Sequence, residues 1–237
     1  MKIKARFVEK KTEVLNVNTF TFKPLEPFVY KAGQYAVFDL GKDGKPFAKP
    51  FSFIDAPGGE NIRITTRMSG SNYKNALDAL KPGDEVGLNG PLGTFCLENE
   101  TKNKLCFLAG GIGITPVKSM IEGLTGSETQ PEITLFYSNK TKDGITFKTE
   151  IDALTGKLNK FNVVYALTEE KDAQPPSGTF ETGYITADMI KKYRADYAEC
   201  RFYVSGPPSF NTAMKKMLTE TLNLADENIV MEAFAGY

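Results

Sequence analysis

The sequence predicts an antiparallel β-barrel domain followed by a doubly wound parallel α/β domain. Up to about residue 100, short runs rich in β-branched and aromatic residues alternate with turn signals. Beyond Lys104, runs typical of buried strands alternate with runs typical of helices. The polar stretch Glu98–Asn103 separates the two patterns, and 237 residues suffice for two domains. We therefore expect one domain over residues 1–99 and a second over residues 100–237.

In the first domain, turn signals such as Ala32-Gly33 and Pro57-Gly58-Gly59 separate the predicted strands. Short strands at this spacing are typical of a closed barrel or a sandwich, and one short helix, Tyr73–Leu80, interrupts the series. The predicted strands are Lys2–Glu9, Glu13–Phe22, Tyr35–Leu40, Phe51–Asp55, Asn61–Arg67 and Glu85–Asn89.

In the second domain, the alternation of strand and helix predicts a parallel sheet with helices on both faces. The polar segment Glu169–Glu181, which contains two prolines, predicts a surface loop. The predicted strands are Leu105–Ala109, Ile133–Tyr137, Val163–Leu167 and Phe202–Val204, and the predicted helices are Thr115–Leu124, Phe147–Leu154, Thr186–Tyr193 and Phe210–Leu222.

Charge and hydropathy exclude several classes of partner. The formal net charge is zero, from 29 basic and 29 acidic residues. The sequence has no basic stripe, so we do not expect a nucleic-acid partner. No apolar run follows the charged start Met1–Arg6, as it would in a secretory signal. No stretch approaches the roughly 18 apolar residues of a spanning helix. We expect a cytoplasmic protein without a transmembrane segment.

The chain has no histidine and three cysteines, Cys96, Cys106 and Cys200. Three cysteines are few for a chain of this length, and their number is odd, so we expect reduced thiols and not a disulfide framework. Three are also too few for an iron–sulfur cluster held by four thiolates. The lack of histidine excludes Ser-His and Cys-His catalysis and removes the usual metal ligands, so no metal site is expected. Any redox chemistry must therefore use an organic cofactor.

A glycine-rich segment, Gly110–Pro116, directly follows the predicted strand Leu105–Ala109. Glycines let the backbone turn tightly and approach a ligand, and a helix start offers N–H groups to a pyrophosphate. We expect Thr115 to be the N-cap and Pro116 to be the first helical residue. A purely structural strand–turn–helix is the alternative.

Three further segments stand out, each with a structural alternative. Lys49–Phe53 places a cation, an aromatic ring and a hydroxyl on one extended segment, which also fits a barrel strand with a core phenylalanine. Val204–Phe210 joins a buried strand to a helix at the edge where α/β sheets bind ligands, which also fits a plain turn. The tail Met231–Tyr237 carries two aromatic residues, which also fit packing at a domain interface.

Together, and in this order, these segments resemble the ferredoxin–NADP reductase family, in particular its minimal members without a fused ferredoxin or haem domain. The resemblance covers essentially the whole chain. The segments that carry it are Ala32-Gly33-Gln34-Tyr35, Lys49-Pro50-Phe51-Ser52, Gly90-Pro91-Leu92-Gly93-Thr94-Phe95, Gly110–Pro116, Ser205-Gly206-Pro207-Pro208 and Glu232-Ala233-Phe234.

The resemblance implies hydride transfer from NADPH or NADH to bound FAD, with electrons passed to an acceptor such as a ferredoxin-like protein. Two alternatives stay open: a free-flavin or ferric reductase, and an electron-transfer subunit with little activity alone. The implied catalytic residues are Ser52, Ser205, Glu232 and Phe234. The implied flavin contacts are Lys49, Pro50, Phe51, Ser52, Phe53, Thr65, Thr66, Arg67, Gly70, Ser71, Lys74, Phe234 and Tyr237, and the implied nucleotide contacts are Gly110, Gly111, Gly113, Thr115, Pro116, Ser138, Lys140, Gly206 and Pro207.

Three residues depart from the family's motifs. Lys49 replaces an arginine and offers a point charge instead of a bidentate fork. We therefore expect weaker binding of the flavin phosphate, or binding of FMN as well as FAD. Phe51 replaces a tyrosine and lacks its hydroxyl. Ser205 replaces the cysteine that usually touches the nicotinamide.

Two expectations concern the nucleotide and the tail. Ser138, Lys140 and Lys142 favour NADPH, because a 2′-phosphate binds hydroxyls and cations; a solvated lysine-rich loop is the alternative. Phe234 and Tyr237 are expected to cover the flavin until nicotinamide displaces them. Truncation after Ala233 would then lower both KM and kcat, whereas mere packing would make it destabilising.

Overall fold

The structure is a computed structural model that describes residues 1–237 except 42–44, 46, 98–101, 128, 171–178 and 233–237. The chain packs into two compact units. The first contains Met1–Glu98 and Lys118–Gly123, and the second contains Asn99–Val117 and Leu124–Tyr237. The boundary at residues 99 and 100 stays a prediction.

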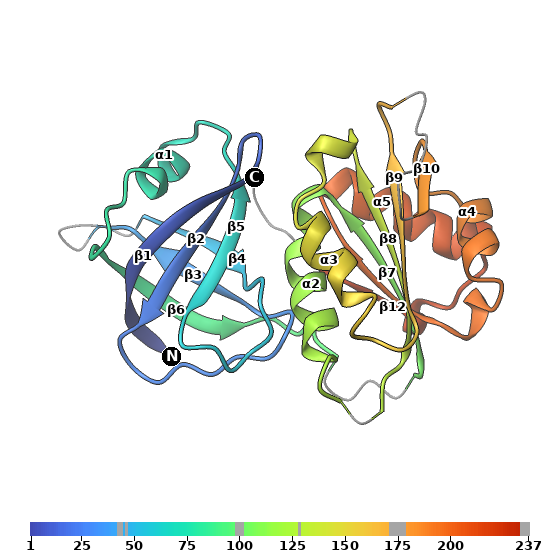
Figure 1. The fold of residues 1–237 in the computed structure, drawn as a ribbon, viewed down its shortest axis with the longest axis horizontal. Helices are drawn as coiled ribbons and strands as arrows, with labels where there is room; N and C mark the ends of the chain where they lie inside the picture. Colours follow the sequence, from blue (N-terminus) through green and yellow to red (C-terminus); the bar gives the residue numbers. More distant parts are fainter. Residues whose placement is uncertain (42–44, 46, 98–101, 128, 171–178, 233–237) are drawn as a thin grey trace. The chain divides into compact units, whose positions relative to one another are not determined.

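The first unit is built on a six-stranded antiparallel sheet with strand order β4-β3-β6-β1-β2-β5 (Figure 1). The expected antiparallel barrel architecture is confirmed, although β1 extends well beyond its predicted end. The strands are β1 (Lys2–Val14), β2 (Val17–Pro24), β3 (Tyr35–Asp39), β4 (Ala48–Ser52), β5 (Ile62–Arg67) and β6 (Glu85–Leu92).

The two edge strands of this sheet approach each other and curl it into a barrel. Phe53, directly after β4, forms an antiparallel bridge with Ile64 of β5, and the N–H of Ile54 donates to the Arg63 carbonyl at 3.1 Å. Inside lies a core rich in aromatic side chains. Its phenylalanines are Phe7, Phe20, Phe22, Phe38 and Phe53.

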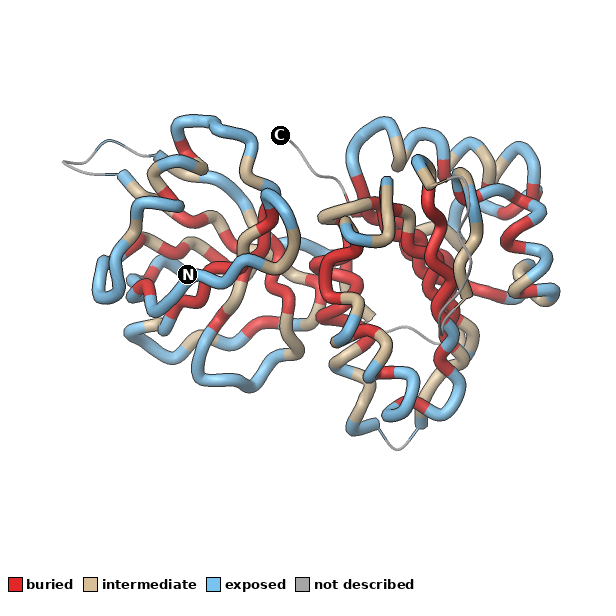
Figure 2. Tube along the Cα trace, turned by 45° about the horizontal axis from the view of Figure 1, so that its top comes forward, coloured by how far each residue is buried: buried red, intermediate tan, exposed pale blue. Residues whose placement is uncertain are grey.

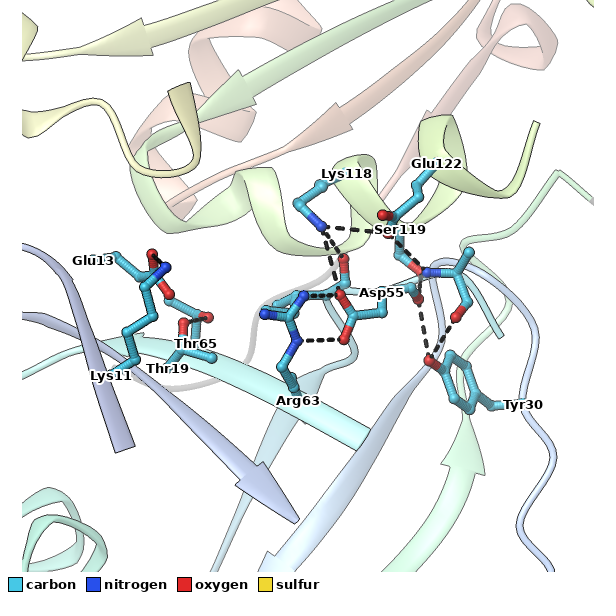
Figure 3. A network of polar contacts seen from close by, with 12 residues as sticks. Lys11, Glu13, Thr19, Tyr30, Asp55, Arg63, Thr65, Lys118, Ser119 and Glu122 are labelled. Atoms are coloured by element: carbon cyan, nitrogen blue, oxygen red, sulfur yellow. Dashed lines mark hydrogen bonds and ion pairs between the residues drawn. The ribbon is translucent and has the colours of Figure 1, made fainter. Parts of the chain in front are cut away.

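A polar network holds the second half of helix α2 (Ile114–Gly123) within the first unit (Figure 3). Lys118 is 1% exposed, and its Nζ lies 3.5 Å from Asp55 and 3.3 Å from Glu122. Arg63 also pairs with Asp55, and Ser119 donates to the Asp55 carbonyl. Buried charges are costly unless paired, so these partners make the burial of Lys118 tolerable.

The second unit contains a six-stranded parallel sheet with strand order β10-β9-β8-β7-β11-β12, which confirms the doubly wound fold. The strands are β7 (Lys104–Gly110), β8 (Glu132–Asn139), β9 (Phe161–Leu167), β10 (Thr179–Thr182), β11 (Arg201–Ser205) and β12 (Ile229–Met231), and the remaining helices of the chain are α1 (Asn72–Asp78), α3 (Lys148–Leu154), α4 (Ala187–Tyr193) and α5 (Pro208–Lys216).

Helices cover both faces of this sheet. Residues of α4 and α5 join one core cluster with alternate residues of β7, β9 and β11. On the opposite face, the Tyr165 hydroxyl of β9 donates to Asp152 of α3 at 2.6 Å. Figure 2 shows the strands of this unit buried along most of their length. This layering leaves the carboxyl ends of the strands as the sheet edge where ligands bind in such folds.

Several local features differ from what the sequence predicted. Thr179–Thr182, part of which was expected to be loop, forms β10 beside β9, where Phe180 stacks on Tyr165 with ring centroids 5.2 Å apart. The short strand β12 was not predicted, because three residues carry too weak a periodic signal. Thr115 is not an N-cap, since a 3₁₀ turn over Gly111–Gly113 precedes α2.

The hydroxyl of Thr115 instead donates to the Ile112 carbonyl at 3.0 Å. Pro116 has no N–H to offer that carbonyl, so the threonine hydroxyl supplies the missing donor. Pro116 is therefore the third residue of α2 and not its first.

Cys96, Cys106 and Cys200 are free thiols. Within the described ranges, no helix is long and apolar enough to cross a bilayer. In the same ranges, no three aspartate, glutamate or cysteine residues gather as metal ligands.

Candidate functional site

In the first unit, the two segments implied in flavin binding meet at the junction of the sheet edges. The bridge between Phe53 and Ile64 fixes their register. In an antiparallel continuation, the residue before Phe53 lies across from the residue after Ile64, so Ser52 faces Thr65. The sequence segments 49–53 and 65–67 are therefore neighbours in space, although β4 and β5 are at opposite ends of the strand order.

The side chains of β4 differ in what they can offer a cofactor. Lys49 and Pro50 are exposed, and Ser52 is buried. Phe51 is half-buried and stacks on Tyr73, with ring centroids 5.8 Å apart. Phe53 is fully buried, with its ring 4.2 Å from that of Tyr30, so the Phe53 side chain packs in the core instead of lining a cofactor site.

The end of β5 brings two cations together. Nζ of Lys74 donates to the Arg67 carbonyl at 2.6 Å. The pKa of Lys74 is lowered, mainly by burial and to a smaller extent by the charge of Arg67. A bound anion would relieve the repulsion between these two cations. Residues 67–74 thus fit a phosphate or pyrophosphate group.

Neighbouring groups complete this segment. The hydroxyls of Thr65 and Thr19 are hydrogen-bonded at 2.6 Å, which orders the β5 edge (Figure 3), and Thr66 is also buried. Ser71 caps α1 by accepting from the Lys74 backbone N–H. Gly70 has a φ of +72°, and a Cβ there would meet no atom within 4 Å. The backbone at Gly70 is therefore open to approach by a ligand.

In the second unit, the glycine turn after β7 packs directly against the turn after β11. A Cβ on Gly113 would lie 2.1 Å from the Ser205 carbonyl oxygen, so only glycine permits this contact. Gly110 and Gly206 both lie against the ring of Phe210, where a Cβ would come within 2.9 Å and 2.5 Å of ring atoms. The two turns form one compact edge.

Gly111 differs from its neighbours. It has a φ of +51°, and a Cβ there would meet nothing within 4 Å. Its carbonyl accepts a hydrogen bond from the Tyr137 hydroxyl at 3.2 Å, which holds the turn to β8. The hydrogen bond from Tyr137 thus anchors the turn, and the space at the Cβ position of Gly111 stays open, as approach by a pyrophosphate requires.

Two buried polar side chains, Ser205 and Glu232, lie at this edge. Ser205 is fully buried, and its hydroxyl has no hydrogen-bond partner within the described part of the chain. Glu232 lies beside it, because its N–H donates to the Val204 carbonyl at 2.9 Å. Burial raises the pKa of Glu232 to about 7. An orphaned hydroxyl next to a partly neutral carboxyl is a donor–acceptor set suited to a bound ligand.

The chain carries a recognisable nucleotide-binding region at this edge. Residues 107–216 match the family model described as Oxidoreductase NAD-binding domain. NADH-cytochrome b5 reductase 2 of Mycosarcoma maydis is 30% identical over 181 residues, which are 73% of this chain and 51% of that protein. The chain belongs to the ferredoxin–NADP reductase family.

Other members show how far the likeness extends. The glycine betaine monooxygenase reductase subunit of Pseudomonas aeruginosa is 27% identical over 218 residues, 90% of this chain and 59% of that protein. The chain therefore spans about half the length of these curated relatives. The crystal structure of a ferredoxin NADP+ reductase from Neisseria gonorrhoeae with bound FAD and NADP matches with a TM-score of 0.82 at 18% identity, over 98% of each chain.

The comparisons name the two ligands of such proteins, FAD and a nicotinamide dinucleotide, and the assignment of the two sets of residues to them stays a prediction. FAD is the cofactor bound in the gonococcal structure, and the matched NAD-binding domain contains the whole glycine turn. The structure brings Gly110, Gly111 and Gly113 together with Ser205 and Gly206. Phe234 and Tyr237 lie outside the described residues, so their roles stay predictions.

Several neighbours of this family site were not expected from the sequence. Phe210 fills the space beside two glycines, and Asn211 donates to the Glu232 carbonyl at 2.8 Å. Of the residues that the sequence did implicate, Thr115 and Pro116 are buried inside α2, and Pro207 is exposed. The sequence signal available for Phe210 was its place two residues after the Gly206-Pro207-Pro208 turn.

Proposed function

We propose that this chain is a flavoprotein reductase that takes electrons from a nicotinamide dinucleotide through bound FAD and passes them to a one-electron protein acceptor of the ferredoxin type. The observation that carries the proposal is the glycine turn closed against Ser205. Gly111 of this turn is open to approach. Ser205 is buried against Gly113 of the same turn, and buried Glu232 follows the strand that pairs with β11. When bound, FAD accepts two electrons from the nicotinamide and releases them singly.

The residues of the chain supply placement. Arg67 and Lys74 would hold the flavin's pyrophosphate, and the backbone at Gly111 would receive that of the nucleotide. Ser52 would offer its hydroxyl to the flavin ring. No acid–base residue is required for hydride transfer itself, so near-contact geometry is the main contribution of the protein.

A protein acceptor is supported by the relatives. The Pseudomonas aeruginosa protein is named as the reductase subunit of a monooxygenase. Such a subunit passes its electrons to another protein component, and this chain shares 90% of its length with the aligned region. With either nucleotide, reduction of a ferredoxin should therefore exceed reduction of free flavin; faster reduction of free flavin would contradict the proposed acceptor.

The purified protein is expected to be yellow and to release FAD when denatured, because the paired cations Arg67 and Lys74 suit a pyrophosphate. The measurement is chromatography of the released flavin, followed by anaerobic addition of NADH or NADPH, which should bleach the flavin absorbance. A colourless protein that neither FAD nor FMN reconstitutes would contradict the proposed function. Release of FMN alone would contradict only the choice of FAD.

Replacing Ser52 with alanine is expected to slow flavin reduction without unfolding the barrel. The lost hydrogen bond is worth about 1–3 kcal/mol if it strengthens in the transition state, which is roughly a 5- to 150-fold lower rate. Stopped-flow absorbance measures the rate. Thr21→Val is the matched control, since it removes another buried hydroxyl of the same barrel. A wild-type rate in Ser52→Ala would remove Ser52 from the site.

A further inference from the structure

The carboxyl ends of β8 and β9 continue side by side beyond the sheet. Ser138 pairs with Ala166 in the parallel register. After the strands end, the N–H of Thr168 donates to the Asn139 carbonyl at 3.0 Å, and the N–H of Glu169 donates to the Lys140 carbonyl at 2.8 Å. Residues 168–170 are therefore fixed against the loop that follows β8.

This pairing places carboxylates on the lysines of the loop. Nζ of Lys140 forms an ion pair with Glu169 at 2.7 Å. Glu170 accepts from the Lys142 backbone N–H at 2.8 Å, and Nζ of Lys142 lies 5.8 Å from the centre of the Phe180 ring. Both lysines that favoured a 2′-phosphate in the sequence thus have partners within the protein.

The same loop lies at the nucleotide edge. Gly110, at the start of the glycine turn, pairs with Ser138 across β7 and β8. A dinucleotide whose pyrophosphate lies on the glycine turn extends its adenosine along the carboxyl ends of the strands. Asn139 is buried there, and its Nδ2 has no partner among the described residues, so it can donate to a ligand oxygen.

We infer that Glu169 makes this chain select NADH over NADPH by meeting the 2′ position of the adenosine ribose. The inference rests on the proposed function and reverses the preference expected from the lysines alone. A 2′-phosphate carries roughly 1.5 to 2 negative charges at neutral pH. It would have to displace Glu169 from Lys140 and then lie beside that carboxylate. A free 2′-hydroxyl can instead donate a hydrogen bond to Glu169.

The exposure of the two glutamates separates their roles. The Glu169 side chain is 55% exposed, so a ligand can reach it. Glu170 is half-buried and engaged by the loop backbone, so it is a positioning residue that holds residues 140–142 in place. Glu169 is therefore the residue to change, and because it is exposed its substitution costs the fold little stability.

The test compares NADH with NADPH in the purified flavoprotein and measures binding of NAD+ and NADP+ by calorimetry as a separate readout. For the wild type, kcat/KM is expected to favour NADH by roughly 10- to 100-fold, the effect of one like-charge contact near a surface. Glu169→Gln should lower this ratio about tenfold and tighten NADP+ binding, because Lys140 becomes available to the phosphate. Adding Lys140→Gln should abolish that gain.

Glu60→Gln is the matched control, since it removes a surface carboxylate that is paired with Lys23 in the first unit. It should leave the nucleotide ratio unchanged. A wild type that prefers NADPH, or an unchanged ratio in Glu169→Gln, would overturn the inference and leave the proposed function standing. Failure of both nucleotides to bind and to reduce the flavin would overturn the proposed function itself.

Discussion

Replacing Gly113 with alanine is expected to disrupt the nucleotide half of the protein. The new Cβ would lie 2.1 Å from the Ser205 carbonyl oxygen and 2.7 Å from Cα of Gly206, and no rotamer change can move backbone atoms away. We expect a loss of about 3 kcal/mol in the free energy of unfolding and about a 100-fold lower rate of flavin reduction by nucleotide. Urea unfolding and stopped-flow absorbance measure the two effects.

Gly111→Ala is the matched control for this substitution. Its Cβ would meet no protein atom, so only the positive φ of +51° penalises it, at about 1–2 kcal/mol. We expect Gly111→Ala to remain well folded but to bind nucleotide weakly, because its methyl group occupies the open space above the turn. Equal unfolding free energies for the two variants would show that the contact with Ser205 is not what requires Gly113.

Glu232→Gln is expected to remove a pH dependence of stability between about pH 4.5 and pH 7. Burial raises the pKa of Glu232 to about 7, above the ordinary glutamate value of about 4.5. Below pH 4.5 the carboxyl is protonated in both the folded and the unfolded state, so it contributes no difference. As pH rises toward 7 the unfolded state loses its proton first, and the folded state becomes less stable by up to about 3 kcal/mol.

The variant should therefore be more stable than the wild type at pH 8 and similar at pH 4. Urea unfolding at several pH values measures this, and the pH profile of flavin reduction by nucleotide provides a second readout. If Glu232 contacts the nicotinamide site, the wild-type profile should have an inflection near pH 7 that the variant lacks. Parallel stability curves for the two proteins across this range would contradict the raised pKa.

Lys118 shows what local sequence cannot reveal. Within a helix pattern, a lysine after Pro-Val predicts a solvated side chain, yet Lys118 is 1% exposed. Its partner Asp55 comes from a distant part of the sequence, beyond β4, and only packing of α2 within the first unit brings the two together. Periodicity describes the shape of an element and not the charges that surround it.

In the second unit, some strands could be predicted from their own sequence and others could not. β7, β8 and β9 have continuous apolar runs, so their identity could be predicted from the sequence. β10 and β12 are short and lack such a signal. They form because β9 and β11 offer them an open edge of backbone donors and acceptors, which is a property of the assembled sheet.

The candidate site divides along the same line. The antiparallel barrel, the parallel α/β sheet and the glycine turn after β7 could be predicted from the sequence, because each follows from local periodicity and from the backbone freedom of glycine. The fit of Gly113 against Ser205, the proton that Glu232 keeps toward neutral pH and the pairing of Lys140 with Glu169 could be seen only in the folded chain. Those properties depend on steric contact, desolvation and charge between residues distant in sequence, and none of these has a local pattern.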